Sequence, residues 1–258
     1  MTSTESNRST EDNSVDSRTV IAATFDVPVE CTFTNAGAMN DLPSYPVPPL
    51  TTIRGLLYAA WGRPSLLGQG SSHSRTMEKD AVEKEQAFRE EFETETAIGI
   101  RVIEDPVSKR DLRTRKKVAR NSDNKKYISY PVEEETLLFP TFRIYITGSA
   151  ERCSAIADAF RNPERLLYLG RSDNLVDIRD VTETRFTIHH DEQVLEDVMV
   201  PNGDGDDPVM LPVRTERLGS YSARPAEVQL VTYGGTVGSY NTLENELDKD
   251  GPFVFIDE

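Results

Sequence analysis

Basic side chains between residues 107 and 126 form the feature of this sequence best suited to chemistry, and that chemistry is anion binding. The segment holds nine bases and two acids, Asp111 and Asp123, so its net charge is +7 in a chain whose formal charge is -15. A polyanionic partner is the simplest physical reason for a chain this acidic to tolerate such self-repulsion. The alternative is a solvated loop that pairs with acidic surface nearby. The nine bases are Lys109, Arg110, Arg113, Arg115, Lys116, Lys117, Arg120, Lys125 and Lys126.

Three shorter features could add to an anion site. In the turn LGRSD, Gly170 permits a close backbone approach, and Arg171 with Ser172 supplies donors suited to phosphate oxygens, although such turns are common. Arg54 lies in the first turn of a predicted helix, where backbone N–H groups favour anions; an ion pair with an acidic neighbour is the other possibility. Tyr45 is either a packing residue or a platform on which a base stacks.

Signals for catalysis and for metal binding are weak. His73 stands alone and His189 is followed directly by His190, but none of them sits in a recognisable catalytic motif. The acidic turn at 204–207 lacks the ligand spacing of a calcium loop. The two cysteines lie far apart, which predicts neither a zinc site nor a disulfide framework. We therefore predict no catalytic residue, no metal site and no cofactor.

Composition points to the setting in which the protein works. The 258 residues include 21 Arg and 8 Lys against 44 acids, a bias that resembles the proteins of extreme halophiles. No apolar stretch approaches the roughly 18 to 20 residues that cross a bilayer, and the first residues lack the basic and apolar regions of a signal peptide. The expectation is a cytoplasmic protein without a membrane segment.

Hydrophobic periodicity predicts the elements that must position these side chains. Residues 1–18 are polar throughout and are expected to form a disordered acidic tail. A β-branched strand begins at Thr19, three prolines in residues 44–49 keep the chain extended, and a helix should follow over about 51–61. A second, charged helix is predicted over about 77–94.

The basic cluster falls between two predicted strands, 97–105 and 139–147. A strand, a long basic excursion and a returning strand describe an arm that projects from a sheet, with its basic part at about 107–130. A short helix at 150–160 and a strand ending near Ile178 complete a β-α-β-β-α-β order.

The predicted fold class is therefore α+β, with a ferredoxin-like domain over 19–182 and a β-rich carboxy-terminal region over 183–258. Five strand-like runs separated by turns make up that second region. Whether it is a separate domain or a sheet packed on the first half stays open at this point.

Several of these segments together resemble a known family. They are SYPVPPLTTIRGLLYAAWG, the basic RDLRTRKKVARNSDNKKY, the strand FPTFRIYIT and LYLGRSDNLVDI. In this order they resemble the fifth CRISPR-associated (Cas-five) family of the repeat-associated mysterious protein (RAMP) superfamily. The likeness covers about residues 19–179.

The resemblance implies a ferredoxin-like fold of the RNA-recognition type and a place in a Cascade-type surveillance complex. There the subunit would bind the 5′ handle of CRISPR RNA, cap the backbone filament and touch the large subunit, meeting target DNA only indirectly. By this analogy the basic arm is the thumb that lies over the RNA, Gly170, Arg171 and Ser172 belong to a glycine-containing loop, and Tyr45 and Arg54 lie near the handle-binding face.

Two other functions stay open. One branch of the family cuts precursor CRISPR RNA with Tyr, Lys and His residues, and Lys116 and Lys117 lie in the arm here, but no histidine is near it in sequence. The other alternative is a protein-docking subunit whose arm binds an acidic protein and no RNA.

Overall fold

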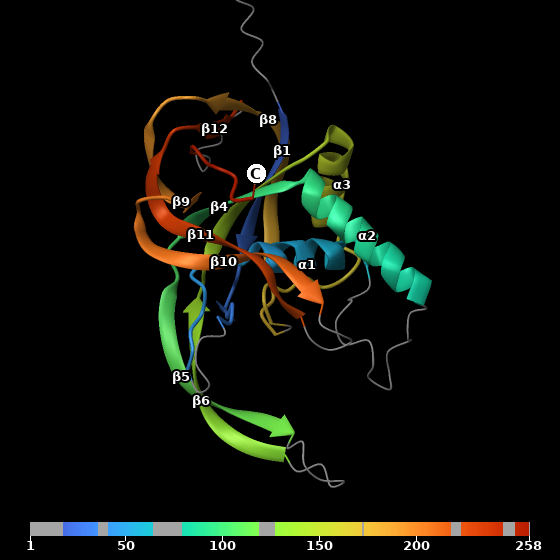
Figure 1. The fold of residues 1–258 in the computed structure, drawn as a ribbon, viewed down its shortest axis with the longest axis vertical. Coiled ribbons are helices and arrows are strands. Elements are labelled where there is room, and N and C mark those ends of the chain that lie inside the picture. The colour runs from blue at the N-terminus through green and yellow to red at the C-terminus, as the bar shows by residue number, and fades with distance from the viewer. Residues whose placement is uncertain are drawn as a thin grey trace, which may run out of the picture.

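The computed structural model describes residues 18–35, 41–63, 79–118, 127–171, 173–217, 223–244 and 251–257. The predicted tail at 1–17 lies outside these residues. Figure 1 shows the described elements as a sheet with helices packed on one face and a long hairpin extending from one end. In chain order they are β1 (Arg18–Asp26), β2 (Glu30–Cys31), β3 (Asp41–Leu42), α1 (Leu50–Ala60), α2 (Lys79–Glu95), β4 (Ala97–Glu104), β5 (Val107–Val118), β6 (Tyr127–Leu138), β7 (Thr141–Thr147), α3 (Ala150–Arg161), β8 (Asp177–His189), β9 (Gln193–Pro201), β10 (Asp206–Arg217), β11 (Ala223–Val237) and β12 (Tyr240–Leu243).

One eight-stranded sheet organises the molecule, in the order β10-β11-β9-β4-β7-β1-β8-β12. At its centre, β1 pairs antiparallel with both β7 and β8, and β7 pairs antiparallel with β4. The question left open by the sequence is thereby answered, because the carboxy-terminal strands join the same sheet as the first half. Strand β8 also runs across the domain boundary predicted at residue 182.

Alternation along β1 divides the core between the two faces of this sheet. Ile21, Ala23 and Phe25 pack into the cluster that contains the buried residues of α1 and α3. The intervening Val20 and Ala22 pack on the opposite face with Phe253 and Phe255 of the carboxy-terminal segment. This is the period of two that a strand buried on both faces imposes.

The carboxy-terminal segment, residues 251–257, is held against β4 rather than forming the strand that its sequence predicts. The N–H of Ile256 donates to the carbonyl of Ile98 at 2.8 Å, and the N–H of Ile98 donates to the Asp257 carboxylate at 2.7 Å. A Cβ on Gly99 would lie 2.5 Å from the carbonyl oxygen of Val254, so only glycine permits so close a crossing at this position.

The helices are positioned by short-range signals. Helix α3 begins at an N-cap, Ser149, whose hydroxyl oxygen accepts from the N–H of Arg152. Helix α2 rests on α1 through aromatic rings: Phe92 meets Trp61 with ring centroids 5.4 Å apart and Tyr58 at 5.8 Å. None of the described helices is long and apolar enough to cross a membrane.

Strands β5 and β6 form the hairpin that leaves the main sheet between β4 and β7. They pair antiparallel along their whole length, from Val107 opposite Leu138 to Val118 opposite Tyr127. The other edge of β6 pairs with β2 near its end and with β3 in parallel at Glu133 and Glu134. We call this hairpin the arm, and its part up to Thr114 and from Pro131 onward the arm root.

Candidate functional site

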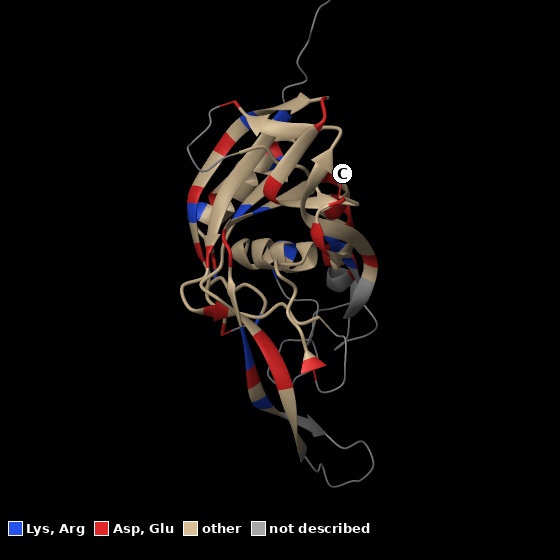
Figure 2. Ribbon diagram, turned by 90° about the vertical axis from the view of Figure 1, so that its left-hand side faces the viewer, with Lys and Arg blue, Asp and Glu red and all other residues tan. Residues whose placement is uncertain are grey.

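The arm root is a network of opposite charges. In the ribbon of Figure 2, basic positions on one strand of the arm (blue) lie beside acidic positions on the other (red). Lys109 pairs with Asp111 of its own strand at 2.7 Å, and Arg113 pairs with Glu30 of β2 at 3.0 Å. A hydrogen bond to Glu30 is the main reason that the pKa of Arg113 is raised. Lys109 and Arg113 thus pair with nearby acids, as the alternative for the basic cluster describes.

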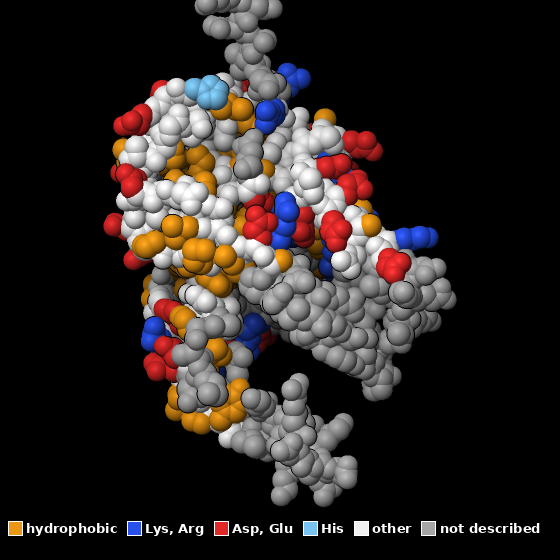
Figure 3. All heavy atoms as spheres, in the orientation of Figure 1, with side chains coloured by type: hydrophobic (Ala, Val, Ile, Leu, Met, Phe, Trp, Pro, Cys, Tyr) orange, Lys and Arg blue, Asp and Glu red, His pale blue; other side chains and the backbone are white. Residues whose placement is uncertain are grey.

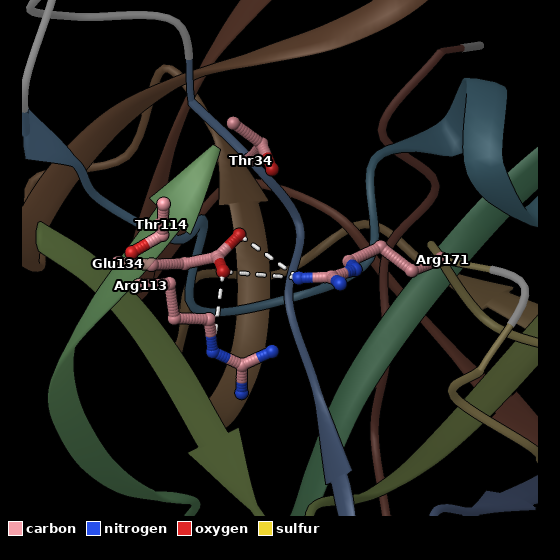
Figure 4. Close-up of a pocket in the computed structure, with 5 residues that line it drawn as sticks. All are labelled: Thr34, Arg113, Thr114, Glu134 and Arg171. Carbon is pink, nitrogen blue, oxygen red and sulfur yellow. Dashed lines mark hydrogen bonds and ion pairs between the residues drawn. The ribbon is translucent and has the colours of Figure 1, made fainter. Parts of the chain in front are cut away.

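Glu134 lies at the centre of this network. Its side chain is only 1% exposed, and both of its carboxylate oxygens accept from Nη1 of Arg171, at 3.1 and 3.0 Å. Nε of Arg113 lies 3.4 Å from the same carboxylate. Figure 4 shows Arg113 and Arg171 converging on Glu134 from the arm and from the loop after α3. The structure therefore brings together two predicted site residues through a carboxylate that the sequence analysis did not single out.

A pocket opens beside this cluster. Its volume is about 420 Å³, and Thr34, Arg113, Thr114, Glu134 and Arg171 line it. Arg171 also faces Asp173, with Nε 3.3 Å from a carboxylate oxygen. Each guanidinium at the pocket therefore already has two carboxylate partners, and the pocket offers little net positive charge to a phosphate.

Glu135 fixes the root from another direction, since neighbouring residues of a strand point to opposite faces. One of its oxygens accepts from the N–H of Ser44 at 3.0 Å, and the other accepts from the hydroxyl of Ser108. The arm root is thus tied to the loop through Glu134 and to the segment before α1 through Glu135. The run of three glutamates between the basic cluster and the returning strand is the signal in the sequence that points to these residues.

The outer part of the arm has a different charge. In the pairing register, Arg115, Lys116 and Lys117 stand opposite Tyr130, Ser129 and Ile128, with no acid across the hairpin. Residues 115–126 hold six bases and one acid, a net charge of +5, whereas 107–114 and 127–138 together hold three bases and four acids, a net charge of -1. Arg120, Lys125 and Lys126 lie outside the described residues. The basic excess of the arm belongs to its outer part.

Arg54 is buried in an ion pair, which is one of the two possibilities that its sequence left open. It is 1% exposed; Nη1 donates to the carbonyl of Val213 at 2.7 Å, and Nη2 pairs with Asp257. The spacing explains its burial, because Leu50, Ile53 and Leu57 share the same helix face. Burial raises the pKa of Asp257, and the Arg54 guanidinium opposes that shift.

Tyr45 packs in the core, which is one of the two roles that its sequence left open. It is 9% exposed within the main core, and burial raises the pKa of its hydroxyl. Its N–H donates to the carbonyl of Phe33 at 2.8 Å, and the N–H of Phe33 donates to the Ser44 hydroxyl at 2.9 Å. The proline-rich segment therefore serves to fasten the chain before α1.

Gly170 is required by the packing of the chain on itself. Its φ is +90°, and a Cβ there would lie 2.7 Å from the carbonyl oxygen of Thr32. The close approach that its sequence suggested is therefore made to Thr32, while Ser172 lies outside the described residues. The turn holds Arg171 where it meets Glu134.

Replacing Gly170 by alanine is expected to lower the free energy of unfolding by about 1–3 kcal/mol, because alanine is strained at this φ and its Cβ collides with backbone. Chemical denaturation measures the loss. Gly238→Ala is the matched control, since nothing lies within 4 Å of a Cβ built there. Equal stability of the two variants would contradict the prediction.

Neither cysteine has the surroundings of a reactive thiol. Cys31 and Cys153 are both buried and free. Burial raises the pKa of Cys31 to about 12 and that of Cys153 to about 11, so both remain protonated near neutral pH. In the part of the chain that the structure describes, no three His, Cys, Asp or Glu side chains gather as metal ligands would.

Comparisons with known proteins agree with this arrangement. A family model described as CRISPR-associated protein (Cas_Cas5) matches residues 31–230, a range that contains the arm, the pocket residues and the loop with Arg171. No curated protein sequence matches the chain.

Two solved structures are similar to this chain. A chain described as belonging to a CRISPR RNA-guided surveillance complex aligns over 84% of this chain and 90% of its own, with 14% identity and a TM-score of 0.51. A CRISPR protein from Archaeoglobus fulgidus aligns over 92% of both chains, with 13% identity and a TM-score of 0.45. The first similarity shows a shared fold.

Proposed function

The chain belongs to the CRISPR-associated protein (Cas_Cas5) family, and from this premise we propose that it is a non-catalytic subunit of a type I CRISPR surveillance complex (Cascade) in antiviral defence. In this role it binds the 5′ handle of CRISPR RNA and caps one end of the backbone filament. Protein contacts to phosphates set the register of the RNA, and sequence matching to target DNA is left to base pairing with the guide.

The observation that carries this proposal is the separation of charge along the arm. A root of net charge -1 is tied to the body by Glu134 and Glu135, whereas residues 115–126 carry +5. In a chain of net charge -15, a basic segment held away from the acidic body suits a polyanion that the body itself would repel. The outer arm is then the thumb that lies over the RNA.

The central strands support the finer fold assignment. We propose that β1, α1, β4, β7, α3 and β8 form a ferredoxin-like βαββαβ unit of the RAMP type, with α2 inserted before β4. The sheet order β4-β7-β1-β8 and its antiparallel pairing are those expected of such a unit.

Exposed apolar side chains support membership in a larger assembly. Figure 3 shows hydrophobic side chains gathered over β10 and β11, where Met210, Val228 and Leu230 are 48%, 43% and 38% exposed. Gathered apolar surface on a soluble protein marks contact with partners. The proposed partners are the backbone and large subunits of the complex.

The endoribonuclease alternative gains no support from the described histidines. Nε2 of His189 lies 2.8 Å from the hydroxyl of Thr242, and its ring stacks on Tyr240 at 4.8 Å. This pair lies where β8 meets the edge strand β12, in a part of the sheet distant in order from β4. His73 lies outside the described residues.

Affinity purification of the tagged full chain from its native host, followed by sequencing of the RNA that accompanies it, tests the proposal. We expect short RNAs that share one repeat-derived 5′ end, together with repeated backbone subunits. Recovery of protein partners without RNA would instead favour the protein-docking function. Cleavage of a precursor RNA by the purified chain would contradict the non-catalytic role.

A further inference from the structure

Two guanidiniums at the arm root are already neutralised by the chain's own carboxylates. Arg113 contacts Glu134 at 3.4 Å and Glu30 at 3.0 Å. Arg171 contacts Glu134 at 3.0 Å and Asp173 at 3.3 Å. The cluster thus contains two cations and three anions, and its net charge is -1 although both of its arginines come from predicted RNA-binding segments.

The burial of Glu134 strengthens this neutralisation. Its side chain is 1% exposed, so water weakens its attraction to the two guanidiniums less than it weakens a fully exposed pair. Glu30 and Asp173 are 36% and 62% exposed and contribute less. A phosphate that entered the pocket would meet the Glu134 carboxylate next to both arginines and would be repelled by it.

The root is also tied to the rest of the chain at two points. Glu134 joins β6 to the loop, and Glu135 joins the same strand to the N–H of Ser44. The two arginines that line the pocket are therefore held beside the Glu134 carboxylate.

We propose that Glu134 keeps the phosphates of the RNA out of the pocket at the arm root. It does so by neutralising Arg113 and Arg171, which line that pocket. Glu134 is thus a positioning residue, which acts through the two arginines. The inference rests on the proposed RNA-binding function and adds a part of the arm that the RNA backbone does not enter.

The salt dependence of RNA binding distinguishes this role from a structural one. Each phosphate neutralised on a single strand adds about 0.7 to the slope of log affinity against log salt. Glu134→Gln removes the central anion, so we expect the slope to steepen by about 0.7 to 1.4 as one or two arginines become available. The region of RNA protected from hydroxyl radicals should lengthen toward the root. The probe is the RNA recovered with the wild-type full chain.

A second variant covers the case in which Glu134→Gln does not fold, since removing a buried carboxylate from a network of ion pairs is costly. Glu30→Gln removes the more exposed of the two carboxylates that pair with Arg113 and leaves Glu134 in place. It should steepen the slope of log affinity against log salt by up to about 0.7. Glu133→Gln is the matched control. Glu133 has the same charge and is exposed on the same strand, but it forms no ion pair among the described residues, so its slope should equal that of the wild type.

The proposal is overturned if the folded Glu134→Gln variant keeps the wild-type slope of log affinity against log salt and the wild-type footprint. It is also overturned if that variant binds RNA more weakly with an unchanged slope, because Glu134 would then only hold the arm root in place. If Glu134→Gln does not fold, an unchanged slope in Glu30→Gln overturns it. Failure of the wild-type chain to bind RNA is a separate result, which would remove the proposed function itself.

Discussion

Replacement of Arg115, Lys116 and Lys117 together by alanine is expected to impair RNA retention and to make the remaining binding less sensitive to salt. These residues stand opposite Tyr130, Ser129 and Ile128 in the register, and none of those three carries a charge. Loss of three phosphate contacts should reduce the slope of log affinity against log salt by about 2. Between 50 and 200 mM salt, the wild type should then lose affinity about 20-fold more than the variant.

A control variant that removes the same charge elsewhere separates the loss of direct phosphate contacts from the effect of a lower overall positive charge. Lys84, Arg161 and Arg185 are exposed and lie on α2, α3 and β8, away from the arm, and their joint replacement by alanine also removes three positive charges. That variant should keep the wild-type slope. Fluorescence anisotropy with labelled RNA at several salt concentrations gives both slopes. Equal slopes in the arm variant and the wild type would remove the arm from the RNA interface.

Replacement of Asp257 by alanine is expected to lower the free energy of unfolding by about 3–5 kcal/mol, the cost of removing one partner from a buried ion pair. The change leaves Arg54, which is 1% exposed, without its carboxylate. It also deprives the N–H of Ile98 of its acceptor. The carboxy-terminal segment should then detach from β4 more readily, which urea denaturation and hydrogen exchange at Ile98 would measure.

Asp158→Ala supplies the reference for this measurement. Asp158 is 76% exposed on α3, and its contact with Arg161 is 4.0 Å long, so its loss should change stability by no more than about 0.5 kcal/mol. The double variant Arg54→Met with Asp257→Ala should recover part of the loss, because it removes both buried charges. If Asp257→Ala is as stable as Asp158→Ala, another contact holds the segment.

Local patterns in the sequence were sufficient to predict most of the helices and strands. The apolar spacing and the flanking breakers predicted a helix at 51–61, and the structure has α1 at Leu50–Ala60. Strands predicted at 97–105 and 139–147 correspond to β4 and β7. These signals are local, since the side-chain periods of helices and strands and the stopping effect of proline act within a few residues.

Charge counts also located the arm, but not how its charge is distributed. The strand, basic segment and returning strand predicted a projecting hairpin, and β5 with β6 forms one that is longer than predicted. Only the register shows that Glu133, Glu134 and Glu135 face the root half of the basic cluster. A linear count treats all nine bases alike, because it contains no information about which residue lies across a hairpin.

The sequence by itself determined that helices and strands are mixed, the positions of most elements and the presence of a basic segment in an acidic chain. Tertiary structure alone decided which acids pair with the described arginines. Arg54 finds Asp257 across 203 residues of sequence, and Arg171 finds Glu134 across 37. Such pairings depend on the closure of the sheet around distant segments, and the free energy of a charge depends on its burial and its neighbours, neither of which a local pattern contains.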